Sequence, residues 1–189
     1  NLLRFEESGE LAAHQQQELP NGMMIVYRNK NETDFMFKKI FEDESYLRHQ
    51  IKLEPGACVF DVGANIGLFS LFVGQVCRSA RIYAFEPLPP LFDVLRINTQ
   101  LHELDVRLLQ CGLGSETKVE EFTYYPNVTL ISGRFGNAAE ERDIVKSFLL
   151  NQPKTHDPAQ ESPGAQLDEL LEERLQSERI ACQLKTLSD

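Results

Sequence analysis

The sequence predicts an α/β fold built on a parallel sheet. The main observation is the stretch 58–87, where an apolar run ends at a glycine turn, a helical stripe follows, and a second apolar run ends at an acid and a proline. A strand, a helix and a strand in succession form a right-handed βαβ unit. A proline-initiated helical stripe after residue 88 and a third apolar run at 106–111 extend the pattern. We therefore expect three parallel strands joined by two helical crossovers.

Length and composition describe one globular domain with a core, since the chain has 189 residues and 42% hydrophobic content. The net charge of −10 argues against a nucleic-acid partner, which would require a basic face. No apolar run reaches membrane length and no signal-peptide pattern is present, so we expect no membrane contact. The four cysteines lack CxxC spacing and paired histidines, which predicts neither a metal site nor disulfides and suits a reducing cytoplasm.

The predicted sheet is preceded by two short segments. Residues 1–20 are polar and glutamine-rich, which predicts an arm or linker. Residues 21–56 form a lead-in, with a strand at 23–27 after a turn signal and a helix that ends near residue 44. The sheet itself is expected to occupy 57–189, and its first strand reads as a buried parallel strand.

The glycine turn at 63–67 predicts a ligand site. Glycines after a first strand let the backbone approach a ligand closely, and an acid at the end of the next strand can accept both hydroxyls of a ribose. Glu86 ends that strand, about 20 residues after Gly67, as expected of a ribose acid. Asp61, inside the first apolar run, either faces the same ligand or caps the turn. The stretch therefore predicts a nucleoside-type ligand.

The same spacing would suit NAD, but the glycines do not. The dinucleotide fingerprint G-x-G-x-x-G would have to place Asn65 and Ser70 at glycine positions. Asn65 would stand at the point where a pyrophosphate approaches the backbone most closely. An oxidoreductase half-domain that binds NAD is therefore the disfavoured alternative.

The run V-F-D-V-G-A-N-I-G-L-F-S at 59–70, with Y-A-F-E-P at 83–87, resembles the S-adenosylmethionine (SAM) site of the FkbM family of methyltransferases. The resemblance implies a Rossmann-like class I methyltransferase sheet of seven strands. It also implies that the glycine turn packs on the methionine and ribose parts of SAM and that Glu86 holds the ribose. The residues it marks as cofactor-binding in this stretch are Asp61, Gly63, Asn65, Gly67 and Glu86.

Further site residues follow from the same resemblance. Residues at the end of the third strand contact the adenine in class I methyltransferases, which implies that role for Gly112 and Leu113. Family members in polyketide and peptide assembly lines have a similar Tyr-x-x-His stretch, which implies that Tyr46 covers SAM and that His49 faces the acceptor. The alternative is that Tyr46 packs with its hydroxyl at the surface and His49 is a solvated loop residue. His49 is the one candidate catalytic residue.

The resemblance covers about residues 20–189, and residues 182–189 resemble the strand that precedes the fourth central strand of the family. We therefore expect a sheet that is truncated before its fourth central strand, as in a fragment. Three parallel strands alone would leave a long apolar edge open.

The leading interpretation is a SAM-dependent O-methyltransferase, in which an acceptor hydroxyl displaces the methyl group in one in-line step. Such a site acts mainly by holding the reactants in line while a base removes the hydroxyl proton. The segment 118–184 resembles that of FkbM-type domains built into synthases. The resemblance implies an intermediate bound to an acyl carrier protein, with neighbouring synthase domains as partners. A non-catalytic docking domain that retains the fold is the other alternative.

Overall fold

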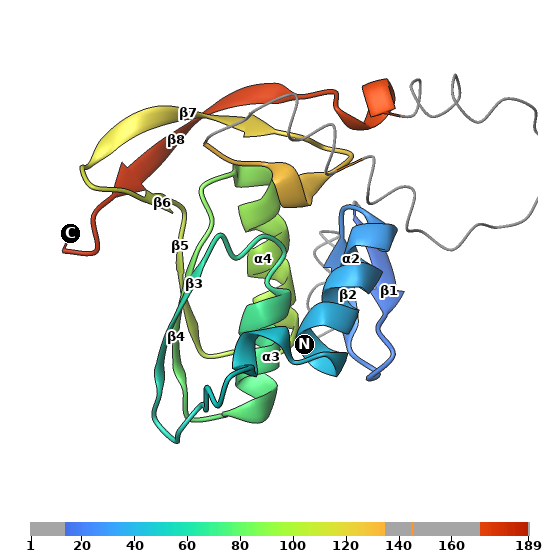
Figure 1. Cartoon of the computed structure of the whole chain (residues 1–189), viewed down its shortest axis with the longest axis vertical. Coiled ribbons are helices and arrows are strands. Elements are labelled where there is room, and N and C mark those ends of the chain that lie inside the picture. The colour runs from blue at the N-terminus through green and yellow to red at the C-terminus, as the bar shows by residue number, and fades with distance from the viewer. Residues whose placement is uncertain (1–13, 135–144, 146–170, 189) are drawn as a thin grey trace, which may run out of the picture. The chain divides into compact units, whose positions relative to one another are not determined.

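The computed structural model describes residues 14–134, 145 and 171–188 (Figure 1). The chain divides into two compact units, of which the first comprises Asn1–Glu120 with Ala181–Asp189 and the second Glu121–Ile180. The first unit holds the predicted βαβ stretch.

The sheet of the first unit contains strands β3 (Cys58–Val62), β4 (Arg81–Phe85) and β5 (Val106–Leu109). The strand order is β3-β4-β5, and both pairings are parallel. The prediction of three parallel strands with helical crossovers is confirmed. Parallel strands direct their carboxyl ends to one edge of the sheet, so the turns that follow β3 and β4 meet there.

The two crossover helices are α3 (Leu68–Val76) and α4 (Pro89–Leu101), and Figure 1 shows both on the same face of the sheet. Proline occupies the first positions of α4, where a missing N–H costs no hydrogen bond. Val73 of α3 packs with Ile82, and Leu95 of α4 packs with Ala84, so both helices bury the same side of β4. The core of this unit therefore lies between the sheet and these two helices.

The N-terminal lead-in begins with an antiparallel hairpin of β1 (Gln15–Glu18) and β2 (Met24–Tyr27). It continues through α2 (Lys30–Phe37), the π-helix η2 (Lys38–Glu42) and the 3-10 helix η3 (Ser45–Leu47). Within the predicted arm or linker at residues 1–20, the backbone of the polar run β1 pairs with β2, while most of its side chains stay exposed. Residues 1–13 lie outside the described part.

The prediction that β3 is buried is half wrong. Val59 and Asp61 point to the helices, but Phe60 and Val62 on the opposite face are 51% and 57% exposed. Side chains alternate between the two faces of a strand, and the helices α3 and α4 cover only one face. The sheet therefore presents an open apolar face in the described part of the chain.

A second sheet has the order β6-β8-β7 and is built from β6 (Gly112–Leu113), β7 (Lys118–Tyr124) and β8 (Glu178–Lys185). Strand β6 pairs in parallel with β8, which brings Gly112 opposite Leu184. The second unit contains the 3-10 helix η4 (Thr129–Ile131) and its own apolar cluster around Val128.

Candidate functional site

The turn between β3 and α3 is held against the end of β4. The backbone N–H groups of Gly63 and Ala64 both donate to the carbonyl oxygen of Phe85, each at 2.9 Å. Gly63, Asn65 and Gly67 all have positive φ angles, of 77°, 51° and 90°. These left-handed positions explain why glycine and asparagine recur in the turn, since other side chains are strained there.

The two glycines of this turn have different surroundings. A Cβ added to Gly67 would lie 2.7 Å from Cδ1 of Leu95, so this glycine allows α4 to approach the turn. A Cβ added to Gly63 would meet nothing within 4 Å. Gly63 therefore offers open backbone to a ligand, whereas Gly67 packs on the protein. A direct cofactor contact of Gly67 stays a prediction.

Glu86 directly follows β4 and faces the glycine turn. Its Oε2 accepts the N–H of Asn65 at 2.8 Å, and its Oε1 accepts the N–H of Leu88 at 3.0 Å. The side chain is only 4% exposed, and this burial raises the pKa of Glu86 to about 7. The two backbone hydrogen bonds oppose that rise in pKa, and the nearby charge of Asp61 adds to it. The structure thus brings Glu86, Asn65 and Asp61 together, as the sequence predicts.

Asp61 is also buried, and it is bonded from α3. The hydroxyl of Ser70 donates to Oδ2 of Asp61 at 2.6 Å. Burial raises the pKa of Asp61, and the hydrogen bonds from Ser70 lower it in part. Sequence reasoning assigned Ser70 no role beyond the missing glycine, although a serine in the first turn of an apolar helix, when buried, needs a hydrogen-bond partner nearby.

The two acids give the site a negative character. None of the ion pairs among the described residues involves Asp61 or Glu86. Burial without a cationic partner is unfavourable for both carboxylates, so a ligand that carries positive charge would stabilise them. The described residues contain no cluster of three His, Cys, Asp or Glu side chains that suits a metal ion. They also contain no helix with the length and apolarity needed to cross a membrane.

Because the pKa of Glu86 is raised in the folded state, ligand-free protein should lose stability as pH rises. The contribution is fully present below the unfolded pKa near 4.5 and is lost as pH rises through about 7. The largest contribution that this pKa shift can make to the free energy of unfolding is about 3 kcal/mol, because one pKa unit corresponds to 1.36 kcal/mol. We expect melting temperatures that fall between pH 5 and pH 8, and a flatter curve for Glu86→Gln. Parallel curves for the two proteins would assign the fall to the net negative charge instead.

The part of strand β8 from Ala181 onward belongs to the first unit. It pairs with β6, the strand that contains the predicted adenine residues Gly112 and Leu113. Burial raises the pKa of the Cys182 thiol to about 11, and the charge of Glu86 contributes to that rise. The thiol of Cys182 therefore lies within the electrostatic influence of the Glu86 carboxylate. The sequence did not predict that β8 would bring a side chain near Glu86.

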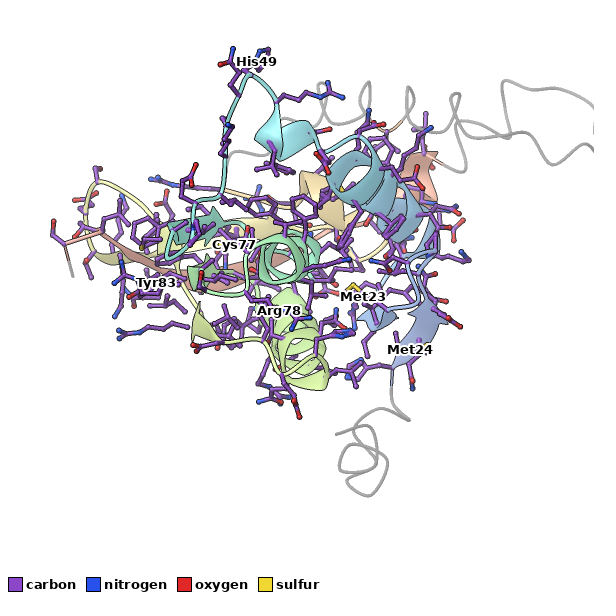
Figure 2. All side chains as sticks on the ribbon, turned by 90° about the horizontal axis from the view of Figure 1, so that it is seen from below. Met23, Met24, His49, Cys77, Arg78 and Tyr83 are labelled. Atoms are coloured by element: carbon purple, nitrogen blue, oxygen red, sulfur yellow. The ribbon has the colours of Figure 1, made fainter. Side chains whose placement is uncertain are left out.

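The structure separates the two residues of the Tyr-x-x-His stretch. The ring of Tyr46 packs on Phe69 of α3 with 4.5 Å between centroids, although the tyrosine is 49% exposed. His49 has a φ of 60° and lies exposed at the outer end of a loop, as Figure 2 shows. Tyr46 thus stands beside the first turn of α3, whereas His49 is not brought to the two acids. Their roles toward SAM and the acceptor stay predictions.

Comparison with known proteins identifies methyltransferases and a synthetase as relatives. The chain is 41% identical over 133 residues to the 31-O-demethyl-FK506 methyltransferase FkbM of Streptomyces tacrolimicus, which covers 70% of this chain and 51% of that protein. It is 40% identical over 177 residues to the AMB antimetabolite synthetase AmbE of Pseudomonas aeruginosa, which covers 90% of this chain and 8% of that protein. The methyltransferase sdnD of Sordaria araneosa is 41% identical over 102 residues, or 53% of this chain and 39% of that protein. The chain therefore spans about half or less of the length of these relatives.

Among solved structures, a chain described as StiE O-MT residues 961–1257 aligns over 99% of this chain and 82% of its own length, with a TM-score of 0.37 and 10% identity. No model of a protein family matches the chain.

Proposed function

Because the chain belongs to the FkbM family of methyltransferases, we propose that it is a SAM-dependent O-methyltransferase that acts on a hydroxyl of a carrier-bound intermediate. The observation that carries the cofactor assignment is the buried carboxylate of Glu86, which bonds to Asn65 in the same turn where Gly63 offers open backbone. A site of this kind accepts the two hydroxyls of a ribose from one side and leaves room for the nucleoside on the other.

The residues present fit SAM. Each oxygen of Glu86 accepts one backbone N–H, which leaves one further acceptor position on each oxygen for a ribose hydroxyl. SAM is a sulfonium cation, and the charges of Asp61 and Glu86 favour a cation. The pyrophosphate of NAD is an anion and would be repelled by the same pair of acids. The site charge therefore favours SAM over NAD.

In this proposal the residues of the chain bind the cofactor and orient it. Bound SAM supplies an electrophilic methyl group for transfer to the acceptor oxygen. Glu86 fixes the ribose, and Ser70 orients the carboxylate of Asp61 at the end of β3. The ring of Tyr46 packs on Phe69 of α3, which supports the predicted role of Tyr46 as a cover for SAM. His49, the candidate catalytic residue, lies on an exposed loop.

The acceptor class is supported by the names of two relatives. FkbM is named as an O-methyltransferase for 31-O-demethyl-FK506, which supports transfer to oxygen. AmbE is named as a synthetase, and the matching segment is 8% of its length, so a similar segment occurs inside a much longer synthetase. This setting supports the proposal that the acceptor is an intermediate held by a carrier protein. Incubating the gene product with labelled SAM and hydroxyl-bearing intermediates, either free or carrier-bound, distinguishes the two forms of acceptor.

Glu86→Ala should weaken binding of S-adenosylhomocysteine by roughly 2–4 kcal/mol, because two charge-assisted hydrogen bonds to the ribose are lost from a buried site. Calorimetric titration of the full-length gene product with S-adenosylhomocysteine, and separately with NAD, measures the effect. Asp93→Ala is the matched control, since it removes an exposed acid of α4. Equal dissociation constants for the wild type and Glu86→Ala would contradict the assignment of Glu86 to the ribose. Binding of NAD without binding of S-adenosylhomocysteine would show that the cofactor is NAD.

A further inference from the structure

Asn98 is a fully buried polar side chain that connects three segments of the first unit. It lies on α4 and has no exposed surface. Its Oδ1 accepts the N–H of Val26 at 2.7 Å, and its Nδ2 donates to the carbonyl oxygen of Val26 at 2.9 Å and to that of Ile66 at 2.8 Å. An asparagine amide has two N–H donors, and both are used here. The side chain thus joins α4, strand β2 and the glycine turn.

The contact with β2 fixes the orientation of the amide. Val26 is paired with Gln16 of β1, and both its N–H and its carbonyl are bonded to Asn98. The amide of Asn98 therefore takes the place of a further strand at this residue of β2. A side chain held by two such bonds, with no exposed surface, has one orientation in which every polar atom is satisfied.

The same face of α4 meets the glycine turn at a second point. Leu95 lies one helical turn before Asn98, and its Cδ1 occupies the space beside Gly67 that a Cβ would need. The carbonyl of Ile66 is bonded to Asn98, and the N–H of Gly67 donates to Ala64 at 2.8 Å. The protein side of the turn is therefore fixed by α4, while the open side at Gly63 remains available to a ligand.

We propose that Asn98 is a positioning residue for the cofactor, which holds the turn 63–67 in its ligand-binding conformation and takes its own orientation from the N-terminal strand β2. This inference rests on the proposed SAM site. Asn98 bonds to the carbonyl of Ile66 in the turn, so it acts on the ligand through the backbone of the turn. The N-terminal hairpin then forms part of the support of the cofactor site.

A second contact allows the role of Asn98 to be tested in a folded protein. Nε2 of His102, at the end of α4, lies 2.7 Å from the carbonyl oxygen of Met24 in β2. This bond is independent of Asn98, so β2 keeps an attachment to α4 when Asn98 is replaced. Thr99 is the matched control, because its buried hydroxyl bonds only to the carbonyls of Leu95 and Arg96 in its own helix.

The test compares Asn98→Ala and Asn98→Asp with Thr99→Val in the full-length gene product, below the melting temperature of each variant. In ligand-free protein, amide hydrogen exchange in the turn 63–67 should be at least tenfold faster in both Asn98 variants than in Thr99→Val. Affinity for S-adenosylhomocysteine should fall at least tenfold in the Asn98 variants and less than threefold in Thr99→Val. Turn exchange and affinity that match those of Thr99→Val would overturn the proposal.

The two readouts separate this inference from the proposed function. A wild type that binds no S-adenosylhomocysteine would refute the SAM assignment, whereas the exchange of the ligand-free turn would still decide the role of Asn98. If the variants do not fold, amide exchange of the wild type with and without S-adenosylhomocysteine tests the proposal instead. S-adenosylhomocysteine should then slow exchange of the Val26 amide more than that of the amides of β5. Equal slowing of exchange in β2 and β5 would reflect global stabilisation, and it would overturn the proposed coupling between β2 and the glycine turn.

Discussion

Gly63→Val is expected to abolish binding of S-adenosylhomocysteine while the protein remains folded. A Cβ built at Gly63 has no protein atom within 4 Å apart from its chain neighbours, so the new side chain would occupy the volume proposed for the cofactor. The φ of 77° adds backbone strain for a β-branched residue, of about 1–2 kcal/mol. Affinity should fall at least a hundredfold, as measured by calorimetric titration, with a melting curve that stays cooperative.

Gly56→Val is the matched control for Gly63→Val. Gly56 has a φ of 80° and likewise nothing within 4 Å of an added Cβ, but it lies before β3, at the opposite end of the strand from the turn. The two variants should lose similar stability, and only Gly63→Val should lose binding. Wild-type affinity in Gly63→Val, or an equal loss of affinity in both variants, would show that the open side of Gly63 does not face the ligand.

The sequence predicts the glycine turn and the position of Glu86 beside it well, because these signals are local. Gly63, Asn65 and Glu86 belong to one βαβ unit, in which strand ends and turn residues fix the geometry. The partners of these residues were not predictable in the same way. Ser70 bonds to Asp61 only because α3 packs on β3, and Asn98 bonds to a residue 72 positions away in the chain. Such contacts depend on how the elements pack, which periodicity does not encode.

Burial was predicted less well than element type, for a related reason. The apolar run at 58–62 forms a parallel strand, but a strand is buried on both faces only when other elements cover both faces. The polar run at 15–18 forms a strand because the backbone of β2 offers partners, whatever the side chains. Side-chain composition indicates which surface prefers burial, and the neighbouring elements decide whether the burial occurs.

The open face of the sheet should make residues 1–189 self-associate when they are expressed alone. Phe60, which packs edge-on against Tyr83, is about half exposed, as is Val62. Among the described residues β3 pairs only with β4, so the backbone groups on its other edge are also available. Burying a phenylalanine or a valine contributes about 1.5–3 kcal/mol each, which favours association through this face.

Sedimentation velocity of the 1–189 polypeptide should therefore show concentration-dependent oligomers and weak binding of S-adenosylhomocysteine. The double variant Phe60→Thr, Val62→Thr should be more nearly monomeric, whereas Val119→Thr, which replaces a similarly exposed valine of β7, should behave as the wild type. A longer polypeptide that supplies a cover for this face should be monodisperse and should bind S-adenosylhomocysteine. A monodisperse 1–189 protein with full affinity would contradict the prediction. Solvent exposure of this face of β3 would then neither drive association nor weaken ligand binding at the adjoining turn.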